Sequence, residues 1–467
     1  MNTDYEITIG LEIHAELDTK TKVFCSCKNE FGSDPNTNCC PVCVGMPGAL
    51  PVLNKHAVEL AIMAGLSCGC EINDYAVFER KNYFYPDLSK AYQISQLEKP
   101  ICVGGKLELS NGKVVRLNRI HLEEDAGKLV HDAFTSNVDY NRGGVPLIET
   151  VTEPDISNAD EAVEFLNELR NTFVFAGVAK CKMEQGGMRC DVNLSVRKKG
   201  DPNLGTRTEM KNLNSFRSVQ RAIEFEAERQ IDILEAGGKI VQETRRWDDD
   251  KGESYGMRDK ENSNDYRYFP DPDLLTVKIS REDVEKLNSV LPLSPKKRRL
   301  KYTDIYGLTD YDAGVLTSSK EVSDFYDECI NFLSEPKEIS NWIQTEILKL
   351  IEGDAIPVSA KNLTTIIRLV LEKKISRTNG KELLAKVCSN GGDAMEIANK
   401  AGMLETIKDE DVIKIIDDLI ANNPKAVEDY KTTPEKVTQF FIGGVMKATR
   451  GKANAEFAKK VIAEKLN

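Results

Sequence analysis

The sequence lacks any apolar run close to the ~18 residues that a membrane-spanning helix needs. Its first residues, Met1 to Glu6, lack the basic and then apolar layout of a secretory signal peptide. An excess of positive charge is also missing, because 63 Lys and Arg stand against 75 Asp and Glu, a net charge of −12. These absences argue against a secreted protein and against a general basic coat for nucleic acid. We expect a cytoplasmic protein without a membrane or DNA partner.

Several common motifs are missing as well. The chain has no phosphate-binding P-loop, no Gly-rich dinucleotide fingerprint, no nucleophile elbow and no helical zinc-protease motif. If the protein uses ATP, it does so without a Walker loop.

What the chain does contain is typical of a globular protein of roughly three domains, since it has 467 residues, of which 40% are hydrophobic and 30% charged. Strand-like alternation dominates the first part. Two prolines and the basic run 296–299 mark a boundary, which we place after residue 292. Helical periodicity dominates the rest, with a break at Asn423-Pro424. Within it, one helix is predicted by the spacing of Trp342, Ile343, Ile347, Leu348 and Ile351.

Four segments of the first part alternate between apolar and polar residues with a period of two, which predicts strands that bury one face. A helix should follow the last of them, capped by Asn214 or Ser215 and ended by Gly237-Gly238. The predicted strands are Tyr5 to Leu17, Lys113 to Leu122, Met188 to Arg197 and Thr206 to Lys211.

Five of the twelve cysteines lie between positions 25 and 43. Cys25 and Cys27 form one close pair, and Cys40 and Cys43 form another, so that four thiolates could surround one Zn²⁺ ion as a structural site. Cys39 would be a spare thiol. The alternative is a cluster of reduced cysteines that bind no metal.

Polar faces of the predicted strands carry several carboxylates. Glu12 and His14 share one face, and Asp191, Glu209 and the pair Glu123-Glu124 lie on other strands. Strand geometry puts Glu123 and Glu124 on opposite faces unless the chain bends there. Together these residues suggest a Mg²⁺ site, although a solvated sheet surface explains each of them singly. Nearby cations and hydroxyls could contact phosphates, namely Arg80, Lys81, Tyr83, Tyr85 and Lys90.

Long sequence blocks resemble the GatB family, the B subunits of the glutamine-dependent aspartyl/glutamyl-tRNA amidotransferases. The likeness covers nearly the whole chain. The blocks are Ile9 to Leu17, Arg80 to Leu88, Tyr92 to Gln96, His121 to Lys128, Asp139 to Gly144, Glu209 to Ser215, Asp265 to Pro270, Tyr311 to Ala313 and Val445 to Asn454.

The resemblance implies an α+β fold in which a cradle-shaped catalytic domain with a mixed or antiparallel sheet precedes an all-α helical domain and a small all-α YqeY-like tail. The corresponding ranges are 1–292, 293–404 and 405–467. It also implies an ATP-dependent carbon–nitrogen ligase, in which the side-chain carboxylate of a misacylated Glu-tRNA(Gln) or Asp-tRNA(Asn) is phosphorylated and then amidated. Ammonia would come from glutamine in a glutaminase A subunit, and a small C subunit would complete a heterotrimer.

Site residues follow from the same resemblance. The Mg²⁺ ligands would be Glu12, Glu124 and Glu209, with His14, Glu123 and Asp191 as looser ligands. Lys81, Tyr83, Tyr85 and Lys211 would contact the nucleotide. Zinc, in members that bind it, would occupy the positions of Cys25, Cys27, Cys40 and Cys43. Residues 425–467 hold eight Lys and one Arg against five acidic residues and would contact the tRNA body.

Two other functions compete with this interpretation. His14-Ala15-Glu16 and Cys40-Pro-Val-Cys43 resemble the motif of zinc nucleobase deaminases, but position 39 is Cys rather than Pro. The second alternative is a non-catalytic scaffold that binds tRNA and whose acidic residues only lie on the surface.

Overall fold

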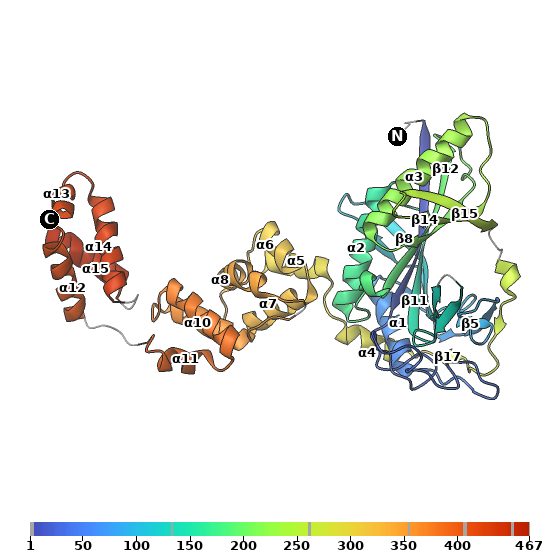
Figure 1. Cartoon of the computed structure of the whole chain (residues 1–467), viewed down its shortest axis with the longest axis horizontal. Coiled ribbons are helices and arrows are strands. Elements are labelled where there is room, and N and C mark those ends of the chain that lie inside the picture. Colours follow the sequence, from blue (N-terminus) through green and yellow to red (C-terminus); the bar gives the residue numbers. More distant parts are fainter. Residues whose placement is uncertain are drawn as a thin grey trace. The chain divides into compact units, whose positions relative to one another are not determined.

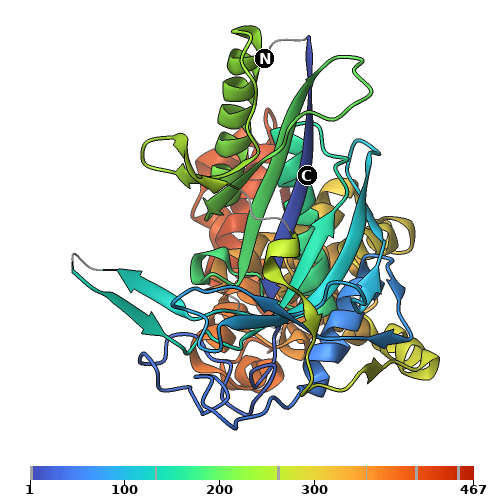
Figure 2. The ribbon, with the colours of Figure 1, turned by 90° about the vertical axis from the view of Figure 1, so that its right-hand side faces the viewer.

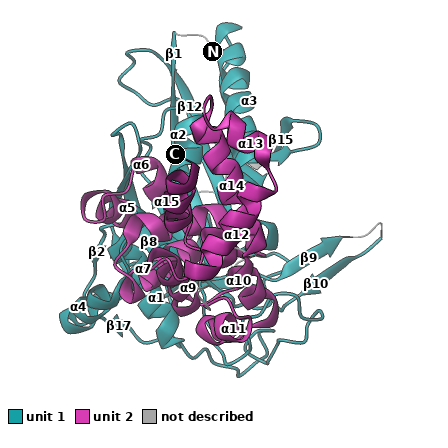
Figure 3. Ribbon diagram, turned by 90° about the vertical axis from the view of Figure 1, so that its left-hand side faces the viewer, with its two compact units in different colours: residues 1–295 teal, residues 296–467 magenta. Residues whose placement is uncertain are grey.

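The computed structural model describes residues 4–131, 134–259, 263–353, 355–404, 409–449 and 453–466 (Figure 1). The chain divides into two compact units, residues 1–295 and 296–467 (Figure 3). The boundary that we predict after residue 292 lies close to this division, and the one after residue 404 lies inside the second unit. Both stay predictions about domains.

A ten-stranded mixed sheet forms the first unit. Its order in the described residues is β15-β14-β13-β12-β1-β11-β8-β6-β2, with β7 paired to β8, and only β13 and β14 are parallel among these pairs. The strands are β1 (Tyr5–Glu16), β2 (Glu71–Ile72), β6 (Cys102–Val103), β7 (Lys106–Glu108), β8 (Val114–Glu124), β11 (Pro146–Thr152), β12 (Met188–Lys198), β13 (Thr208–Leu213), β14 (Glu243–Asp248) and β15 (Glu253–Asp259).

The alternation of β1 decides which face of the sheet is buried. Ile9, Leu11 and Ile13 are almost completely buried in the core of this unit. Three helices belong to the same core and lie against the sheet: α1 (Lys55–Ser67), α2 (Ala159–Ala176) and α3 (Phe216–Glu235) (Figure 1). The polar side chains of β1 are left on the opposite face, where the candidate site lies.

Smaller elements surround this sheet. The ribbon of β9 and β10 stands away from it (Figure 2). The remaining elements of the unit are β3 (Tyr75–Ala76), β4 (Glu79–Asn82), β5 (Tyr92–Ser95), β9 (Lys128–His131), β10 (Ser136–Asp139), η1 (Met183–Gln185), η2 (Ser263–Tyr266), β16 (Phe269–Pro270), β17 (Val277–Lys278) and α4 (Arg281–Val290).

The second unit is helical and contains two separate hydrophobic cores, one within residues 302–404 and one within residues 412–466. Its elements are α5 (Pro295–Asp304), α6 (Asp310–Leu316), α7 (Lys320–Phe332), α8 (Pro336–Trp342), η3 (Ile343–Ile347), η4 (Leu348–Leu350), α9 (Ala360–Leu371), α10 (Arg377–Asn390), α11 (Ala394–Lys400), α12 (Asp409–Ala421), α13 (Pro424–Asp429), α14 (Pro434–Ala448) and α15 (Ala455–Leu466).

The structure confirms the α+β class, the four predicted strands and the helix that follows Ser215. The Ser215 hydroxyl accepts a hydrogen bond from the backbone of Ser218 at 3.0 Å, and Gly237 has a positive φ of 75°. One prediction is wrong: the apolar pattern from Trp342 to Ile351 is not one α-helix, since a π-helical turn follows Trp342. Among the described residues, no helix is long and apolar enough to cross a membrane.

Candidate active site and metal centres

The polar face of β1 is the centre of the candidate site. On one side Glu12 pairs with Asp191 of β12 and His14 pairs with Arg189. On the other side His14 pairs with Glu149 of β11. Because side chains alternate along a strand, Glu12 and His14 share the face that helices α1 to α3 do not cover. Three strands therefore bring ionisable side chains together on this face.

Three carboxylates from three strands form the first cluster, which we name the acidic group: Glu12, Asp191 and Glu209. One oxygen of each lies within 4.8 Å of the others. Lys211 contacts two of them, Asp191 at 2.5 Å and Glu209 at 3.3 Å. The amide of Asn193 donates to Glu12 at 2.9 Å. The side chains are thus held in place before any ion is bound.

The carboxylates of the acidic group repel one another. Burial raises the pKa of Glu12, and the charges of Glu149, Glu209 and Asp191 raise it further, while Lys211 lowers it. One lysine does not balance this concentration of negative charge. An all-oxygen donor set of this kind fits Mg²⁺, which prefers carboxylates.

A second cluster, the imidazole–carboxylate group, contains His14, Glu123 and Glu149, whose ligand atoms also lie within 4.8 Å of one another. His14 Nε2 lies 3.5 Å from Glu123 and 3.4 Å from Glu149. His121 completes the cluster, with Nε2 at 3.6 Å from Glu123 and 3.4 Å from Glu149. Each carboxylate thus lies between two imidazoles.

In this second group, the pKa of each side chain depends on the charges of its neighbours. Burial alone would lower the pKa of His14, but the hydrogen bond and charge of Glu149 and the charge of Glu123 raise it to about 9. Burial works against ionisation of Glu149, yet the charges of His121 and His14 hold its pKa well below the usual range. A cation can use the His14 nitrogen only after His14 loses its proton. The donor set therefore fits a divalent cation in competition with a proton.

Glu123 and Glu124 take different partners. Glu123 lies in the imidazole–carboxylate group, whereas Glu124 accepts hydrogen bonds from Lys90 at 2.5 and 2.7 Å and from the backbone of Ile94 at 2.9 Å. Strand β8 runs through both residues without a bend between them. The structure therefore does not bring Glu124 to either cluster, although the resemblance implied that it binds Mg²⁺.

The residues expected to contact the nucleotide lie at different distances from these clusters. Lys211 contacts the acidic group through its ion pairs with Asp191 and Glu209. The Lys81 ammonium lies 4.9 Å from the ring centroid of Tyr266 and 5.8 Å from that of Tyr83. Burial works to lower the pKa of Lys81, but the neighbouring tyrosine Tyr268 and the carboxylates Glu123 and Glu149 raise it. Tyr85 is half exposed.

Two further candidate cations are engaged elsewhere. Arg80 donates to Asp271 at 2.7 Å and to Asp273 at 2.9 Å, and its guanidinium lies 4.3 Å from the ring centroid of Tyr92. Lys90 is paired with Glu124. Contact of either cation with a phosphate would have to compete with these ion pairs.

The four cysteines that we predict as zinc ligands meet in the loop between β1 and α1. Their sulfurs lie within 4.8 Å of one another, and Cys43 is the hub, at 3.4 Å from Cys25 and 3.7 Å from both Cys27 and Cys40. The hydrogen bond from Cys25 lowers the pKa of Cys43 to about 4, and the charge of Lys22 adds to this effect. Cys39 instead contacts Asn141 at 3.7 Å. The donor set fits a tetrahedral Zn²⁺ with no position left for water.

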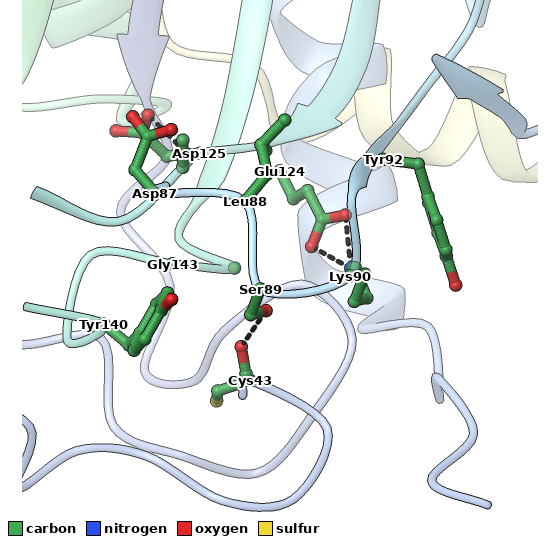
Figure 4. Close-up of a pocket in the computed structure, with 12 residues that line it drawn as sticks. Cys43, Asp87, Leu88, Ser89, Lys90, Tyr92, Glu124, Asp125, Tyr140 and Gly143 are labelled. Atoms are coloured by element: carbon green, nitrogen blue, oxygen red, sulfur yellow. Dashed lines mark hydrogen bonds and ion pairs between the residues drawn. The ribbon is translucent and has the colours of Figure 1, made fainter. Parts of the chain in front are cut away.

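A small pocket lies between the cysteine loop and the end of β8 (Figure 4). Its lining includes Cys43, Lys90, Tyr92, Glu124, Asp125 and Tyr140. The Lys90–Glu124 ion pair and the hydrogen bond from Ser89 to the Cys43 carbonyl oxygen border it. The pocket thus joins the cysteine loop to the strand that carries Glu123, but no residue of the two clusters lines it.

Sequence reasoning missed two members of the imidazole–carboxylate group, Glu149 and His121. The segment around Glu149 is Pro-Leu-Ile-Glu-Thr-Val-Thr, and a lone charge in so apolar a strand is a usable signal. His121 lies within a block that carries the family resemblance, but we did not consider it as a site residue. Glu149 and His121 are paired across β11 and β8, and this contact depends on the tertiary structure, so residue spacing alone does not predict it.

Comparisons with known proteins agree over the whole chain. A family model described as the GatB/GatE catalytic domain matches residues 7–285, and one described as a GatB domain matches residues 324–466. A protein of Caldicellulosiruptor bescii is 50% identical over 99% of both chains, and one of Carboxydothermus hydrogenoformans is 47% identical over 99% of both. A protein of Persephonella marina is 46% identical over 99% of this chain and 100% of its own. All three are named as B subunits of an aspartyl/glutamyl-tRNA(Asn/Gln) amidotransferase.

Proposed function

Because the chain belongs to the GatB family, we propose that its polar sheet face is where ATP activates the side-chain carboxylate of a misacylated Glu-tRNA(Gln) or Asp-tRNA(Asn) for amidation. The relatives' name describes an amidotransferase, so the chain is one component of a glutamine-dependent ligase. This function takes precedence over the deaminase and over the scaffold. In the structure, His14 contacts carboxylates rather than the cysteines, which disfavours a deaminase site.

The reaction sets the requirements for the site. A carboxylate is a poor acyl donor because its leaving group would be oxide. Its oxygen attacks the γ-phosphorus of ATP, ADP leaves, and the acyl phosphate carries a good leaving group. Ammonia then attacks the acyl carbon, phosphate leaves and one proton is lost, which gives the amide. Positioned charge and exclusion of water are what a protein adds to such a sequence.

The acidic group supplies the residues that would hold Mg²⁺, namely Glu12, Asp191 and Glu209. His14, Glu123 and Glu149 could hold a second divalent cation. When bound, the cation supplies neutralising charge for the phosphates. Glu124 is left out of this proposal because its carboxylate lies in neither cluster and pairs with Lys90 instead.

Lys81, Lys211, Tyr83 and Tyr85 are proposed to contact the nucleotide. Lys211 reaches the acidic group directly. Lys81 is an ammonium beside aromatic rings, and its pKa responds to the charges of the second group. A lysine held in this way supplies fixed positive charge next to transferring phosphoryl oxygens.

Zinc is proposed at Cys25, Cys27, Cys40 and Cys43 in a structural role. Four thiolates close the coordination shell, so this metal takes no part in the reaction. We expect that its removal affects stability more than the chemical step.

Two protein partners and a tRNA complete the proposal. The relatives are named as one lettered component of an amidotransferase, which implies a complex of several different chains. Ammonia would come from a glutaminase A subunit, and a small C subunit would join the pair. The net charge of residues 425–467 is +4, and helices α14 and α15 carry half of it, which suits contact with the tRNA backbone.

One observation carries the proposal: carboxylates from sequence-distant strands converge on one polar face of the sheet. The test uses the assembled complex and measures ATP hydrolysis that depends on misacylated tRNA. Glu12→Gln and Glu209→Gln should abolish it. Glu6→Gln is the matched control, because Glu6 lies on the same face of β1 but pairs with Arg197. Full hydrolysis in both Glu12→Gln and Glu209→Gln would favour the scaffold.

A further inference from the structure

The cysteine loop encloses a lysine whose role is not explained by the reaction. The side chain of Lys22 is completely buried. Its ammonium lies 3.4 Å from Cys43 Sγ and donates a hydrogen bond to the carbonyl oxygen of Tyr140 at 3.0 Å. An ammonium removed from water in this way is stable only beside compensating negative charge.

Carboxylates do not provide that charge. No ion pair joins Lys22 to a carboxylate among the residues that the structure describes, so the sulfur of Cys43 is its anionic partner. Cys43 is also the hub of the four-cysteine cluster. Four thiolates around one divalent cation leave two negative charges, and one ammonium cancels half of that excess.

We propose that Lys22 is a positioning residue for the four-cysteine metal centre: it neutralises part of the thiolate charge and ties the centre to the turn formed by residues 139–144. The proposal rests on the zinc assignment made under the proposed function. It goes further in assigning to Lys22 a role in metal affinity.

The methylene carbons of the Lys22 side chain are closely packed. Gly144 lies beside the stem, where a Cβ would be 3.6 Å from the Lys22 Cδ atom. The Gly144 carbonyl oxygen accepts a hydrogen bond from the backbone of Val23 at 2.9 Å, and its N–H donates to the carbonyl oxygen of Asp125 at 2.9 Å. These two backbone hydrogen bonds of Gly144 thus link Val23, the neighbour of Lys22, to Asp125 in the segment that follows β8.

The turn at residues 139–144 carries the connection onward. Tyr140 accepts the hydrogen bond of Lys22, and its backbone N–H donates to Asn36 of the cysteine loop at 2.8 Å. Arg142 donates to the carbonyl oxygens of Ala126 and Gly127 at 2.9 and 2.7 Å. Figure 4 shows Tyr140 and Gly143 beside the cysteine loop. Metal occupancy should therefore influence the order of residues 125–127, which follow Glu123 and Glu124.

The first test measures zinc affinity of the purified full chain by competition with a chromophoric chelator. Lys22→Met removes the ammonium, and Lys22→Gln removes the charge but keeps a group that can donate to Tyr140. Lys20→Met is the matched control, because Lys20 is exposed and lies two positions away. Partners of metal ligands typically contribute about 10- to 100-fold in affinity, and we expect a loss of that size in both Lys22 variants and none in the control.

A second measurement needs no variant and so does not depend on how the substituted chains fold. Zinc is removed from the wild-type chain, and amide hydrogen exchange is compared with and without the metal. Faster exchange in residues 139–144, with unchanged exchange in α2, supports the connection.

Three outcomes would overturn the proposal. Wild-type zinc affinity in folded Lys22→Gln would show that the ammonium does not stabilise the centre. Unchanged exchange in residues 139–144 after zinc removal would refute the connection to the turn. A wild-type chain that binds no zinc would remove both this role and the zinc assignment, but amidation by the assembled complex would still stand and would keep the ligase function separate.

Discussion

Lowering the pH should weaken cation binding at the imidazole–carboxylate group. The pKa of His14 is raised from 6.5 to about 9 because Glu149 and Glu123 stabilise the protonated ring. Below pH 9 most His14 side chains therefore carry a proton in the metal-free protein. A cation that uses the His14 nitrogen must displace that proton, so binding and proton release are linked.

The loss of cation affinity follows from the difference between the pKa of His14 and the pH of the experiment. Each pH unit below the pKa costs about 1.36 kcal/mol, or a factor of about ten in affinity. At pH 7, two units below a pKa of about 9, displacing the proton costs about 2.7 kcal/mol, or about 100-fold in affinity. The part of this loss between pH 8 and pH 7 is about tenfold.

Mn²⁺ provides the assay, since its free concentration is read from its electron paramagnetic resonance signal. Binding to the full chain is measured at pH 7 and pH 8 under anaerobic conditions, and proton release is measured by calorimetry in buffers of different ionisation enthalpy. His14→Gln should reduce the pH dependence, leaving the part that comes from Glu12 of the acidic group, whereas His56→Gln, at an exposed position on α1, should retain it in full. Equal pH dependence in wild type and His14→Gln would refute the reasoning.

Three other outcomes follow from the same contacts. Glu124→Gln should leave Mn²⁺ affinity within about twofold of wild type, because Glu124 pairs with Lys90 outside both clusters; a large loss in equilibrium binding would restore it as a ligand. Glu226→Ala should cost about 1.5–3 kcal/mol in urea unfolding, because it removes the buried carboxylate that pairs with Arg229 and Arg245 and leaves them the more exposed Glu243; a loss under 1 kcal/mol would contradict this. In the metal-free protein, the stabilisation from the pair of His14 with Glu149 is fully present below pH 6.5 and is lost as the pH rises through about 9. The difference in melting temperature between wild type and His14→Gln should therefore shrink over that pH range.

Much of the first unit could be predicted from the sequence because its strands bury one face only. The alternation of Tyr5 to Glu16 sets both the strand and the side on which Glu12 and His14 lie. The helix after Ser215 could be predicted equally well, since an N-cap residue, an apolar stripe and a terminal glycine all indicate the same helix. The cysteine cluster was readable because its ligands are close in sequence.

The pairing of strands could not be read in this way. Which of Glu123 and Glu124 joins the site depends on the register of β8 against β11, and the sequence pattern alone left both open. Glu149 and His121 were missed because their contacts with His14 or Glu123 exist only after these strands pair. The π-helical turn after Trp342 was missed because apolar spacing cannot distinguish it from an α-helix.

Anomalous scattering from Mn²⁺ bound to the protein with a non-hydrolysable ATP analogue tests the central claim most directly. We expect a cation about 2.1 Å from carboxylate oxygens of Glu12, Asp191 and Glu209 on the polar sheet face. A cation held by Glu124 instead, or no cation on that face while the nucleotide is bound, would contradict it.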